Sequence, residues 1–435
     1  MANNIRTFLD ELESSGELKR VSEKVSTRFE VSRLMMENDG GSALFFDNLR
    51  DHETHLVSGL CGTKKRLARA LGKGEDQIYQ TINHAISNPV EPKVVSDGPV
   101  KENIEPPKLT KIPILVHYEK DPGPYITAGI VTARNAEDNI ENVSIHRMLV
   151  LNDNHFTLRI VPRHLYALCQ MAKSRGDDSL DIGVAIGLRP PIMIAAASHA
   201  PFGVSEYAVA NAMMDGQLTL TEIGSSGLRV PSEAELVFEA KILLNKEVDE
   251  GPFVDLTGTY DIVRKQPLVE VTKVYHRTGY IYQALLPSGS EHRILMGLPF
   301  EAKIYDAVRG VVPNVKAANL TVGGSGWLHA VISIEKQTEG DGKNALMAAF
   351  GAHPSLKHAV VVDSDIDVAN PHEVEWAIAT RFQADKGLII IQNARGSTLD
   401  PSADQHNGTT TKVGVDATRT LSKPVEKFMR AKIPN

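Results

Sequence analysis

Side chains that could hold a metal ion stand at three separate places in the first half of the chain. Asn142 begins a predicted strand, His164 follows the next predicted strand, and Glu206 begins a predicted helix. Mixed nitrogen and oxygen donors suit a divalent cation. The spacing matches no known metal motif, however, and Glu206 has the ordinary alternative of a carboxylate favoured by the helix dipole. The residues alone therefore leave both interpretations open.

Arg147 stands on the same predicted strand as Asn142, but the two are not expected to face the same way. Alternation places Asn142, Ser144 and His146 on one face and Val143, Ile145 and Arg147 on the other, unless a bulge intervenes. Polar residues on one face of a strand are ordinarily just its solvated side. Whether these residues share a site depends on the local geometry of the strand.

Two contiguous patterns are weaker candidates for a site. The glycine-rich segment 322–326 follows a predicted strand, but it lacks the G-x-x-x-x-G-K-[ST] pattern of a phosphate loop, so we expect a tight turn. The aspartates at 363, 365 and 367 lack the central glycine and closing glutamate of a calcium loop. We expect a solvated loop that caps the helix predicted at residue 372.

The elements that must position these residues follow from periodicity and from Gly, Pro, Asn and Asp punctuation. Helices are predicted at 4–14, 64–71, 204–214, 234–239, 300–309, 341–351, 372–380 and 423–432. Strands are predicted at 42–46, 55–58, 126–134, 142–151, 155–160, 179–186, 191–197, 228–231, 253–260, 268–276, 281–286, 315–320, 327–335, 358–362 and 387–392. The polar segment 398–413 favours a loop.

The order of these elements predicts a multidomain protein of mixed α/β and α+β class. The Pro-rich passage 88–113 breaks both helical and strand periodicity and is a plausible linker. We therefore expect a small N-terminal α/β domain over 1–105, a central β-barrel-like domain with helical insertions over 106–300, and a C-terminal α/β domain over 301–435.

Composition excludes several classes of protein. The 435 residues are 42% apolar and 23% charged, with a net charge of -7, which argues against nucleic acid as the main partner. The only cysteines, Cys61 and Cys169, are too few for a disulfide framework and indicate a reducing compartment. The first residues lack a secretory signal and no apolar stretch is long enough to cross a bilayer. We expect a cytoplasmic protein without a membrane span.

Several ordered motifs resemble those of the UbiD family of prenylated-FMN-dependent decarboxylases, and the resemblance extends over nearly the whole chain. It also implies that the central domain is a split β-barrel of the flavin-binding kind. Jointly the matches are specific, although no single one is. They are Asn142-x-x-x-x-Arg147, Arg163-His164, Ser205-Glu206-Tyr207, the segment VPSEAELVFE at 230–239, EGPFVD at 250–255 and KVGVDAT at 412–418.

The resemblance implies two bound groups, prenylated FMN and a divalent metal such as Mn²⁺. Asn142, His164 and Glu206 would hold the metal, whose charge would bridge the protein to the flavin phosphate. Ser198 and nearby carbonyls would complete a K⁺ site. The remaining residues implied along the cofactor are Ile145, His146, Arg147, Arg163 and Lys412.

The resemblance also implies a catalytic trio of Arg147, Glu250 and Asp255. Arg147 would orient the substrate carboxylate, Glu250 would hold Arg147, and Asp255 would exchange a proton with the substrate carbon. Asp255 replaces the glutamate commoner in the family, which shortens its reach by one methylene. The electron sink is the cofactor.

The chain is similar to a compact archaeal branch that converts trans-anhydromevalonate 5-phosphate to isopentenyl phosphate and carbon dioxide, a step in isoprenoid precursor synthesis. The alternatives are a reversible decarboxylase of an aromatic acid, such as a 4-hydroxybenzoate derivative, and a flavin-binding protein without catalysis. The expected partners are a small carboxylate substrate, a flavin prenyltransferase that supplies the cofactor, and further copies of the chain in a homodimer or larger homo-oligomer, with the basic C-terminal helix as one contact.

Overall fold

The structure is a computed structural model that describes residues 4–135, 137, 140–431 and 433. The chain folds into two compact units, Met1–Leu295 and Met296–Asn435. Mixed α/β architecture in both units agrees with the predicted multidomain class. Within the described residues, no helix is both long enough and apolar enough to span a membrane.

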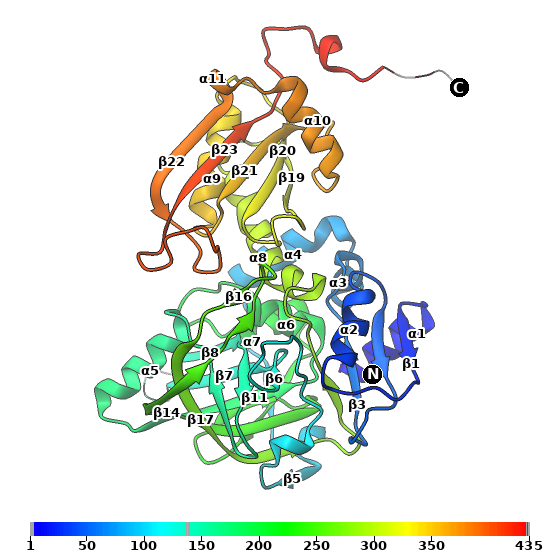
Figure 1. The fold of residues 1–435 in the computed structure, drawn as a ribbon, viewed down its shortest axis with the longest axis vertical. Helices are drawn as coiled ribbons and strands as arrows, with labels where there is room; N and C mark the ends of the chain where they lie inside the picture. The colour runs from blue at the N-terminus through cyan, green and yellow to red at the C-terminus, as the bar shows by residue number, and fades with distance from the viewer. Residues whose placement is uncertain (1–3, 136, 138–139, 432, 434–435) are drawn as a thin grey trace. The chain divides into compact units, whose positions relative to one another are not determined.

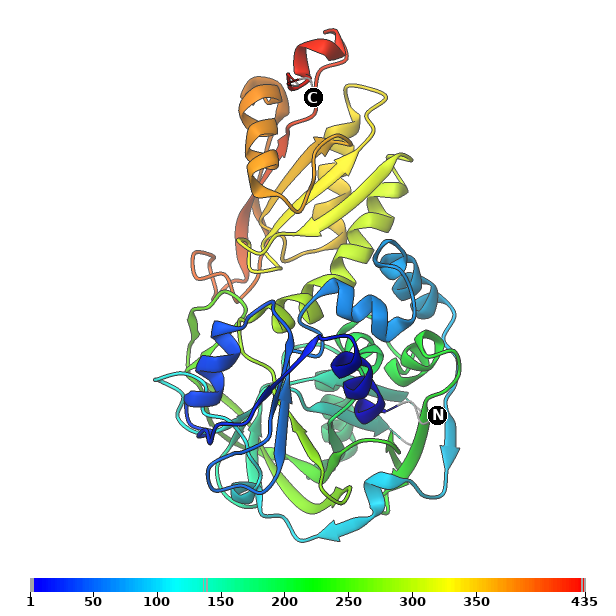
Figure 2. The same ribbon diagram turned by 90° about the vertical axis from the view of Figure 1, so that its right-hand side faces the viewer.

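A small four-stranded sheet forms the beginning of the first unit, in the order β1-β2-β3-β18. Its two faces are covered by α1 and α2, which lie on opposite sides of the strands (Figure 2). Phe45 and Val57 pack with α1, whereas Leu44 and Phe46 pack with α2, as strand alternation requires. The elements are α1 (Ile5–Ser14), β1 (Leu18–Val21), α2 (Glu30–Glu37), β2 (Ala43–Phe46), β3 (His55–Ser58) and β18 (Ile281–Gln283).

A nine-stranded antiparallel sheet forms the centre of the first unit (Figure 1). Its order is β6-β9-β10-β17-β14-β11-β7-β8, and β5 pairs with β17 off this path. Among the described residues the path is open, so the expected barrel is not closed. The strands are β5 (Asn103–Glu105), β6 (Tyr125–Ile126), β7 (Ile130–Asn135), β8 (Ile140–Ile145), β9 (Met148–Val150), β10 (His155–Leu158), β11 (Ser179–Ile186), β14 (Leu236–Glu250) and β17 (Arg264–His276).

Helices and two smaller sheets complete the first unit. Leu165, Leu168 and Ala172 of α5 enter the main core together with residues of the nine-stranded sheet. The remaining helices are α3 (Lys64–Leu71), α4 (Ile78–Ser87), α5 (His164–Arg175), α6 (Pro190–Ala197) and α7 (Glu206–Met213). The smaller sheets are β13-β12-β4 and the hairpin β15-β16, with strands β4 (Lys93–Val95), β12 (Thr219–Ile223), β13 (Leu228–Pro231), β15 (Phe253–Val254) and β16 (Tyr260–Asp261).

The second unit is a five-stranded mixed sheet in the order β19-β20-β21-β23-β22. Val374 and Ala377 of α10 pack on one face, and Leu346 of α9 meets Gly414 on the other, so helices cover both faces. The elements are α8 (Ser290–Arg309), which leads into this unit, β19 (Val315–Leu320), β20 (His329–Ile334), α9 (Asp341–Ala352), β21 (His358–Asp363), α10 (Pro371–Arg381), α11 (Ala384–Gly387), β22 (Leu388–Arg395) and β23 (Thr409–Asp416).

Two elements have the opposite type from the prediction. Residues 191–197 form helix α6 and not a strand, because Pro190 and Pro191 occupy its first turn, where proline is favoured. Periodicity alone cannot tell whether a short buried apolar run of this kind forms a helix or a strand. Residues 234–239 do not form a helix, because Leu236 begins the long strand β14 and pairs with β11 and β17 on its two sides. This tertiary pairing overrides the local helix propensity.

Other predicted elements are interrupted or shorter. The predicted strand 142–151 divides into β8 and β9, and 253–260 forms a hairpin of two short strands. The predicted loop 398–413 ends earlier, because Thr409 already begins β23. In place of the helix at 423–432, the structure has a single 3₁₀ turn over Val425–Phe428, and Lys432 lies outside the described residues.

The two contiguous patterns have structural roles. Residues 322–326 form the tight turn between antiparallel β19 and β20, as predicted. The segment after Asp363 is the expected strand-to-helix loop, with Asp365 and Asp367 exposed, but Asp363 is buried, and Arg381 binds both Asp363 and Asp365, the latter at 2.8 and 2.7 Å. The cap of α10 comes from Asn370, whose side chain accepts from the His372 amide.

Candidate active site

A break in the strand sets the orientation of Arg147. Strand β8 ends at Ile145 and β9 begins at Met148, so His146 and Arg147 lie outside both ladders. The carbonyl of Arg147 accepts a hydrogen bond of 3.2 Å from the amide of Arg159. Simple alternation could not locate this break. Because Arg147 lies outside both ladders, its side chain need not point in the direction that strand alternation would give it.

Three carboxylates surround the Arg147 guanidinium, whose side chain is 9% exposed. Its Nε and Nη2 donate to the two oxygens of Glu250 at 3.0 and 2.9 Å, which is a bidentate fork. Its Nη1 donates to Asp255 at 2.8 Å, and Nη2 also donates to Asp261 at 3.0 Å. The structure therefore brings the three predicted residues together and adds Asp261, which has no signal in the sequence.

The end of one long strand and the hairpin that follows it supply the acids. Glu250 is the last residue of β14 and is fully buried. Gly251 follows with φ 98°, a conformation that favours glycine, and the chain turns there into β15. Asp255 directly follows β15, and Asp261 ends β16. One local fold thus delivers all three carboxylates to the same guanidinium.

The charges in this cluster stabilise one another. Burial alone would lower the pKa of Arg147, but the hydrogen bonds and negative charges of Glu250, Asp255 and Asp261 raise it above its ordinary value. Burial also acts to raise the pKa of Asp261, yet its bonds to Arg264 and Arg147 lower it overall. With these shifts in pKa, Arg147 and Asp261 form an ion pair at neutral pH.

Tyr125, a second residue without any signal in the sequence, donates to Glu250 at 3.1 Å.

A second cluster contains the three predicted metal ligands. Asn142 on β8 donates to Glu206 at 3.3 Å, and the Glu206 carboxylate also accepts from the Val143 amide at 2.7 Å. His164 Nδ1, at the first residue of α5, lies 3.9 Å from Glu206 Oε1. One strand and the first residues of two helices therefore supply this cluster, and Asn142 and Glu206, 64 positions apart in sequence, are in direct contact.

This second cluster fits a cation by its charge and its donor atoms. Glu206 is 3% exposed, and burial raises its pKa although the bond from His164 acts to lower it. A buried carboxylate without a full counter-charge favours a bound cation. The described residues contain no group of three His, Cys, Asp or Glu side chains arranged for a metal, so the expected ion would also need the Asn142 amide as a donor.

The other residues implied along the cofactor have well-defined places. His146 lies between Ser144 Oγ at 2.8 Å and the Arg159 carbonyl at 2.9 Å, and burial lowers its pKa to about 4. Arg163 contacts His199, and Ser198 donates to the Ala195 carbonyl at 2.7 Å.

Ile145 ends β8, beside the strand break. Lys412, in the second unit, donates to the Pro354 carbonyl at 2.6 Å, and burial lowers its pKa to about 8. Its role toward a flavin stays a prediction.

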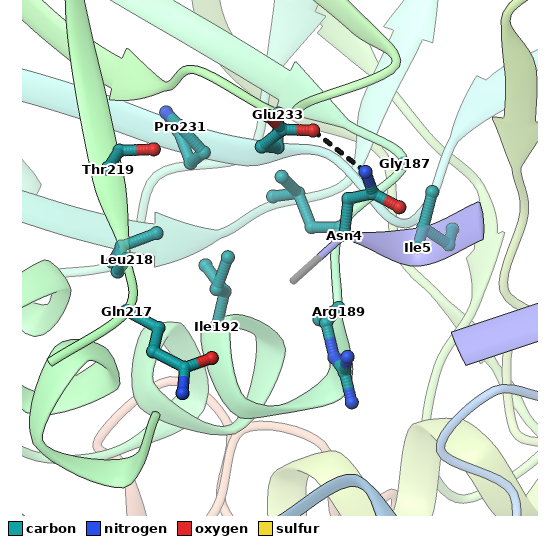
Figure 3. Close-up of a pocket in the computed structure, with 11 residues that line it drawn as sticks. Asn4, Ile5, Gly187, Arg189, Ile192, Gln217, Leu218, Thr219, Pro231 and Glu233 are labelled. Carbon is teal, nitrogen blue, oxygen red and sulfur yellow. Dashed lines mark hydrogen bonds between the residues drawn. The ribbon is translucent and has the colours of Figure 1, made fainter. Parts of the chain in front are cut away.

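A cavity of about 450 Å³ in the first unit is lined by other residues (Figure 3). Asn4 and Glu233, joined by a hydrogen bond of 2.8 Å, form part of its wall, together with Arg189 and Gln217. None of the residues of the Arg147 cluster or of the Glu206 cluster lines it. The candidate active site is therefore distinct from this cavity.

Three family models match this chain in sequence order. They describe the N-terminal, Rift-related and C-terminal domains of 3-octaprenyl-4-hydroxybenzoate carboxy-lyase and match residues 9–86, 93–290 and 293–417. Together with the buried acid-arginine cluster, these matches define the class: the chain belongs to the UbiD family of decarboxylases.

Particular relatives are similar over nearly their full length. The anhydromevalonate phosphate decarboxylase of Methanothermobacter thermautotrophicus is 45% identical over 428 residues, which cover 98% of this chain and 99% of the relative. The UbiD-class enzyme HmfF from Pelotomaculum thermopropionicum in complex with FMN superposes with a TM-score of 0.96 at 40% identity, covering 99% and 97% of the two chains. An evolved dimeric form of HmfF in complex with prFMN gives a TM-score of 0.92 at 37% identity, covering 100% and 97%.

Proposed function

We propose that this chain is a prenylated-FMN-dependent decarboxylase that converts trans-anhydromevalonate 5-phosphate to isopentenyl phosphate and carbon dioxide. The observation that carries the proposal is the 45% identity to a decarboxylase of that substrate along almost the whole length of both chains. The Arg147 cluster supports it, because all three groups that the reaction requires are present and in contact.

The reaction breaks one carbon-carbon bond and forms one carbon-hydrogen bond. The carboxylate leaves as carbon dioxide, its bonding electrons stay on C2, and a proton is added to C2, so there is no net oxidation or reduction. Prenylated FMN, when bound, supplies the temporary sink for these electrons. The protein has to orient the carboxylate, exclude water from the reacting carbon and deliver the proton.

Arg147 orients the substrate carboxylate, and Glu250 keeps the guanidinium in place. The fork to Glu250 fixes the plane of the guanidinium through two hydrogen bonds. Asp255 accepts from Nη1 of Arg147 and its side chain is 16% exposed, whereas that of Glu250 is fully buried, so Asp255 is the acid of the trio that can reach a ligand. Asp255 gives its proton to C2, and Asp261 keeps the cluster charge-balanced when Asp255 is protonated.

Asn142, His164 and Glu206 hold a divalent cation such as Mn²⁺, which would bind the flavin phosphate. The support is the burial of Glu206, which raises its pKa, and the contacts of Glu206 with Asn142 and His164. In the same proposal, Ile145, His146, Arg163 and Lys412 contribute to the flavin site, and Ser198 contributes to a K⁺ site.

We also propose that the enzyme works in the cytoplasm as a homo-oligomer and receives its cofactor from a flavin prenyltransferase. Both cysteines are free and buried, which agrees with a reducing compartment. Strand β22 is an edge strand of its sheet, and its Ile390 is 56% exposed, which suits a contact with another copy. The division at residues 105 and 300 into three domains belongs to the same proposal.

Co-expression with a flavin prenyltransferase and a turnover assay test the proposal. The holoenzyme is identified by its flavin absorbance and offered trans-anhydromevalonate 5-phosphate or 4-hydroxybenzoate. We expect carbon dioxide and isopentenyl phosphate from the first and a rate at least about 100-fold lower from the second, because one pocket rarely serves both shapes. Absence of carbon dioxide from the first substrate would refute the proposal, and carbon dioxide from the second alone would favour the aromatic alternative.

A further inference from the structure

One arginine close to the Asp255 hairpin has no acidic partner. Arg264 is paired with Asp261, and Arg147 with three carboxylates, but Arg293 forms no ion pair within the described part of the chain. Its Nε is buried and lacks a hydrogen-bond partner. Arg293 as a whole is only half-buried, so an anion from solution can reach this guanidinium, which no carboxylate of the described chain neutralises.

A short chain of contacts connects Arg293 to Asp255. Arg293 Nη2 donates to Ser288 Oγ at 3.1 Å, and Ser288 Oγ donates to the carbonyl of Leu256 at 3.3 Å, the residue after Asp255. Gly258, in the same hairpin, lies so close that a Cβ there would be 3.2 Å from Ser288 Oγ. The guanidinium of Arg293 therefore stands beside the turn that carries the proton donor.

The electrostatic surroundings of His292 agree with this placement. Burial lowers the pKa of His292, the Asp255 charge acts to raise it, and the charges of Arg147 and Arg293 act to lower it further. The same imidazole is thus within the influence of Asp255 and of both arginines. Of these two arginines, Arg147 is paired with three acids and Arg293 with none among the described residues.

The proposed substrate carries two anionic groups at its two ends, a carboxylate and a phosphate monoester. Arg147 is committed to the carboxylate, so the phosphate requires a second donor group. We infer that Arg293, assisted by the hydroxyl group of Ser288, binds the phosphate of the substrate and makes the enzyme selective for phosphorylated acids. This inference rests on the proposed function for the identity of the ligand.

Arg159 is the other arginine in the region without a carboxylate partner, and its position differs. Its amide binds the Arg147 carbonyl and its own carbonyl accepts from His146, so it lies at the strand break. That is the side on which the flavin residues are proposed. Arg293 lies at the hairpin of Asp255, where the substrate carbon has to receive its proton, so we assign the substrate phosphate to Arg293.

The test compares two substrates, trans-anhydromevalonate 5-phosphate and its unphosphorylated form, with holoenzyme variants. In Arg293→Gln the ratio of kcat/KM for the phosphorylated over the unphosphorylated acid should fall by about 10- to 100-fold, as expected for loss of a charge-assisted hydrogen bond. Arg293→Lys should retain part of the ratio, because it keeps the charge. Arg33→Gln, at an arginine that is 68% exposed, is the matched control and should keep the wild-type ratio.

Three results would overturn the inference. The first is an unchanged ratio in Arg293→Gln. The second is a fall of the ratio in a further variant, Arg159→Gln, and not in Arg293→Gln. The third is loss of bound flavin from Arg293→Gln, which would assign Arg293 to the flavin phosphate instead. Turnover of the unphosphorylated acid and the flavin absorbance together report whether the variant is folded.

A binding measurement separates this inference from the proposed function. If the wild-type holoenzyme turns over neither acid, the proposed function is refuted, and titration calorimetry with inorganic phosphate still tests Arg293. We expect the affinity of Arg293→Gln for phosphate to be at least about 10-fold weaker than that of wild type and of Arg33→Gln. Equal affinity in all three proteins would contradict the assignment.

Discussion

Replacing Glu250 by Gln should remove one of the hydrogen bonds that hold Arg147, without creating a cavity. Glu250 accepts three hydrogen bonds, from Tyr125 and from Nε and Nη2 of Arg147. A Gln side chain can keep the two bonds to its remaining oxygen, but its NH₂ group would face the Nη2 donor. One charge-assisted bond is lost, which costs about 2 to 3 kcal/mol. Arg147 keeps Asp255 and Asp261, so the larger cost of an unpaired buried cation is avoided.

The assay for this variant is the release of carbon dioxide by the holoenzyme under saturating substrate. If all of the lost energy belongs to the transition state, kcat should fall by about 30- to 150-fold. Asp261→Asn is the matched control, because Asp261 accepts from the same Nη2 atom but only through one oxygen. Its kcat should fall by less than about 10-fold. The reasoning is refuted if Glu250→Gln retains at least half of the wild-type kcat, or if Asp261→Asn is the more damaging change.

Three further predictions concern metal binding, substrate reach and pH. Glu206→Gln should reduce bound manganese, measured by elemental analysis, at least about 10-fold relative to the exposed control Glu222→Gln; equal metal content would contradict the assigned ligand. Asp255→Glu should lower kcat by about 10- to 100-fold, because the longer side chain displaces the carboxyl group from C2; an unchanged rate would show that its length is not tuned to the substrate. Burial lowers the pKa of His117 to about 3, so unfolding should become easier as the pH falls from about 6.5 toward 3, where only the unfolded state gains the proton. In denaturant titrations, the free energy of unfolding of His117→Phe should depend less on pH in this window. Burial raises the pKa of the neighbouring Asp121, which gives that group the opposite pH dependence in both proteins. An unaltered pH dependence in the variant would exclude His117 as the source.

Strong local signals made much of the fold predictable. The helix at 64–71 and the strands at 179–186 and 315–320 have the predicted bounds, because their periodicity and punctuation agree. Where local preference and tertiary pairing conflict, the sequence misleads: the helix formers of 234–239 lie in the centre of a sheet. The break at His146 is also invisible, since nothing in the residues marks where the ladder ends.

The candidate site was predictable only through its resemblance to a family. Spacing alone left Asn142, His164 and Glu206 undecided, because their contacts join residues from three separate elements. Asp261 had no signal, since it comes just after the strand predicted at 253–260, where an aspartate is ordinarily a turn residue. Arg293 is detected by the absence of an acidic partner among the described residues, a property that exists only in three dimensions.

The central claim is that Asp255, held by Arg147, delivers the proton to the substrate carbon. The most direct measurement is decarboxylation of trans-anhydromevalonate 5-phosphate in D₂O by the wild-type and Asp255→Asn holoenzymes, followed by NMR. Wild type should give isopentenyl phosphate with one deuterium at the carbon that lost carbon dioxide. Asp255→Asn should retain the flavin spectrum and lose at least about 100-fold in rate. Deuterated product formed by Asp255→Asn at the wild-type rate would contradict the account.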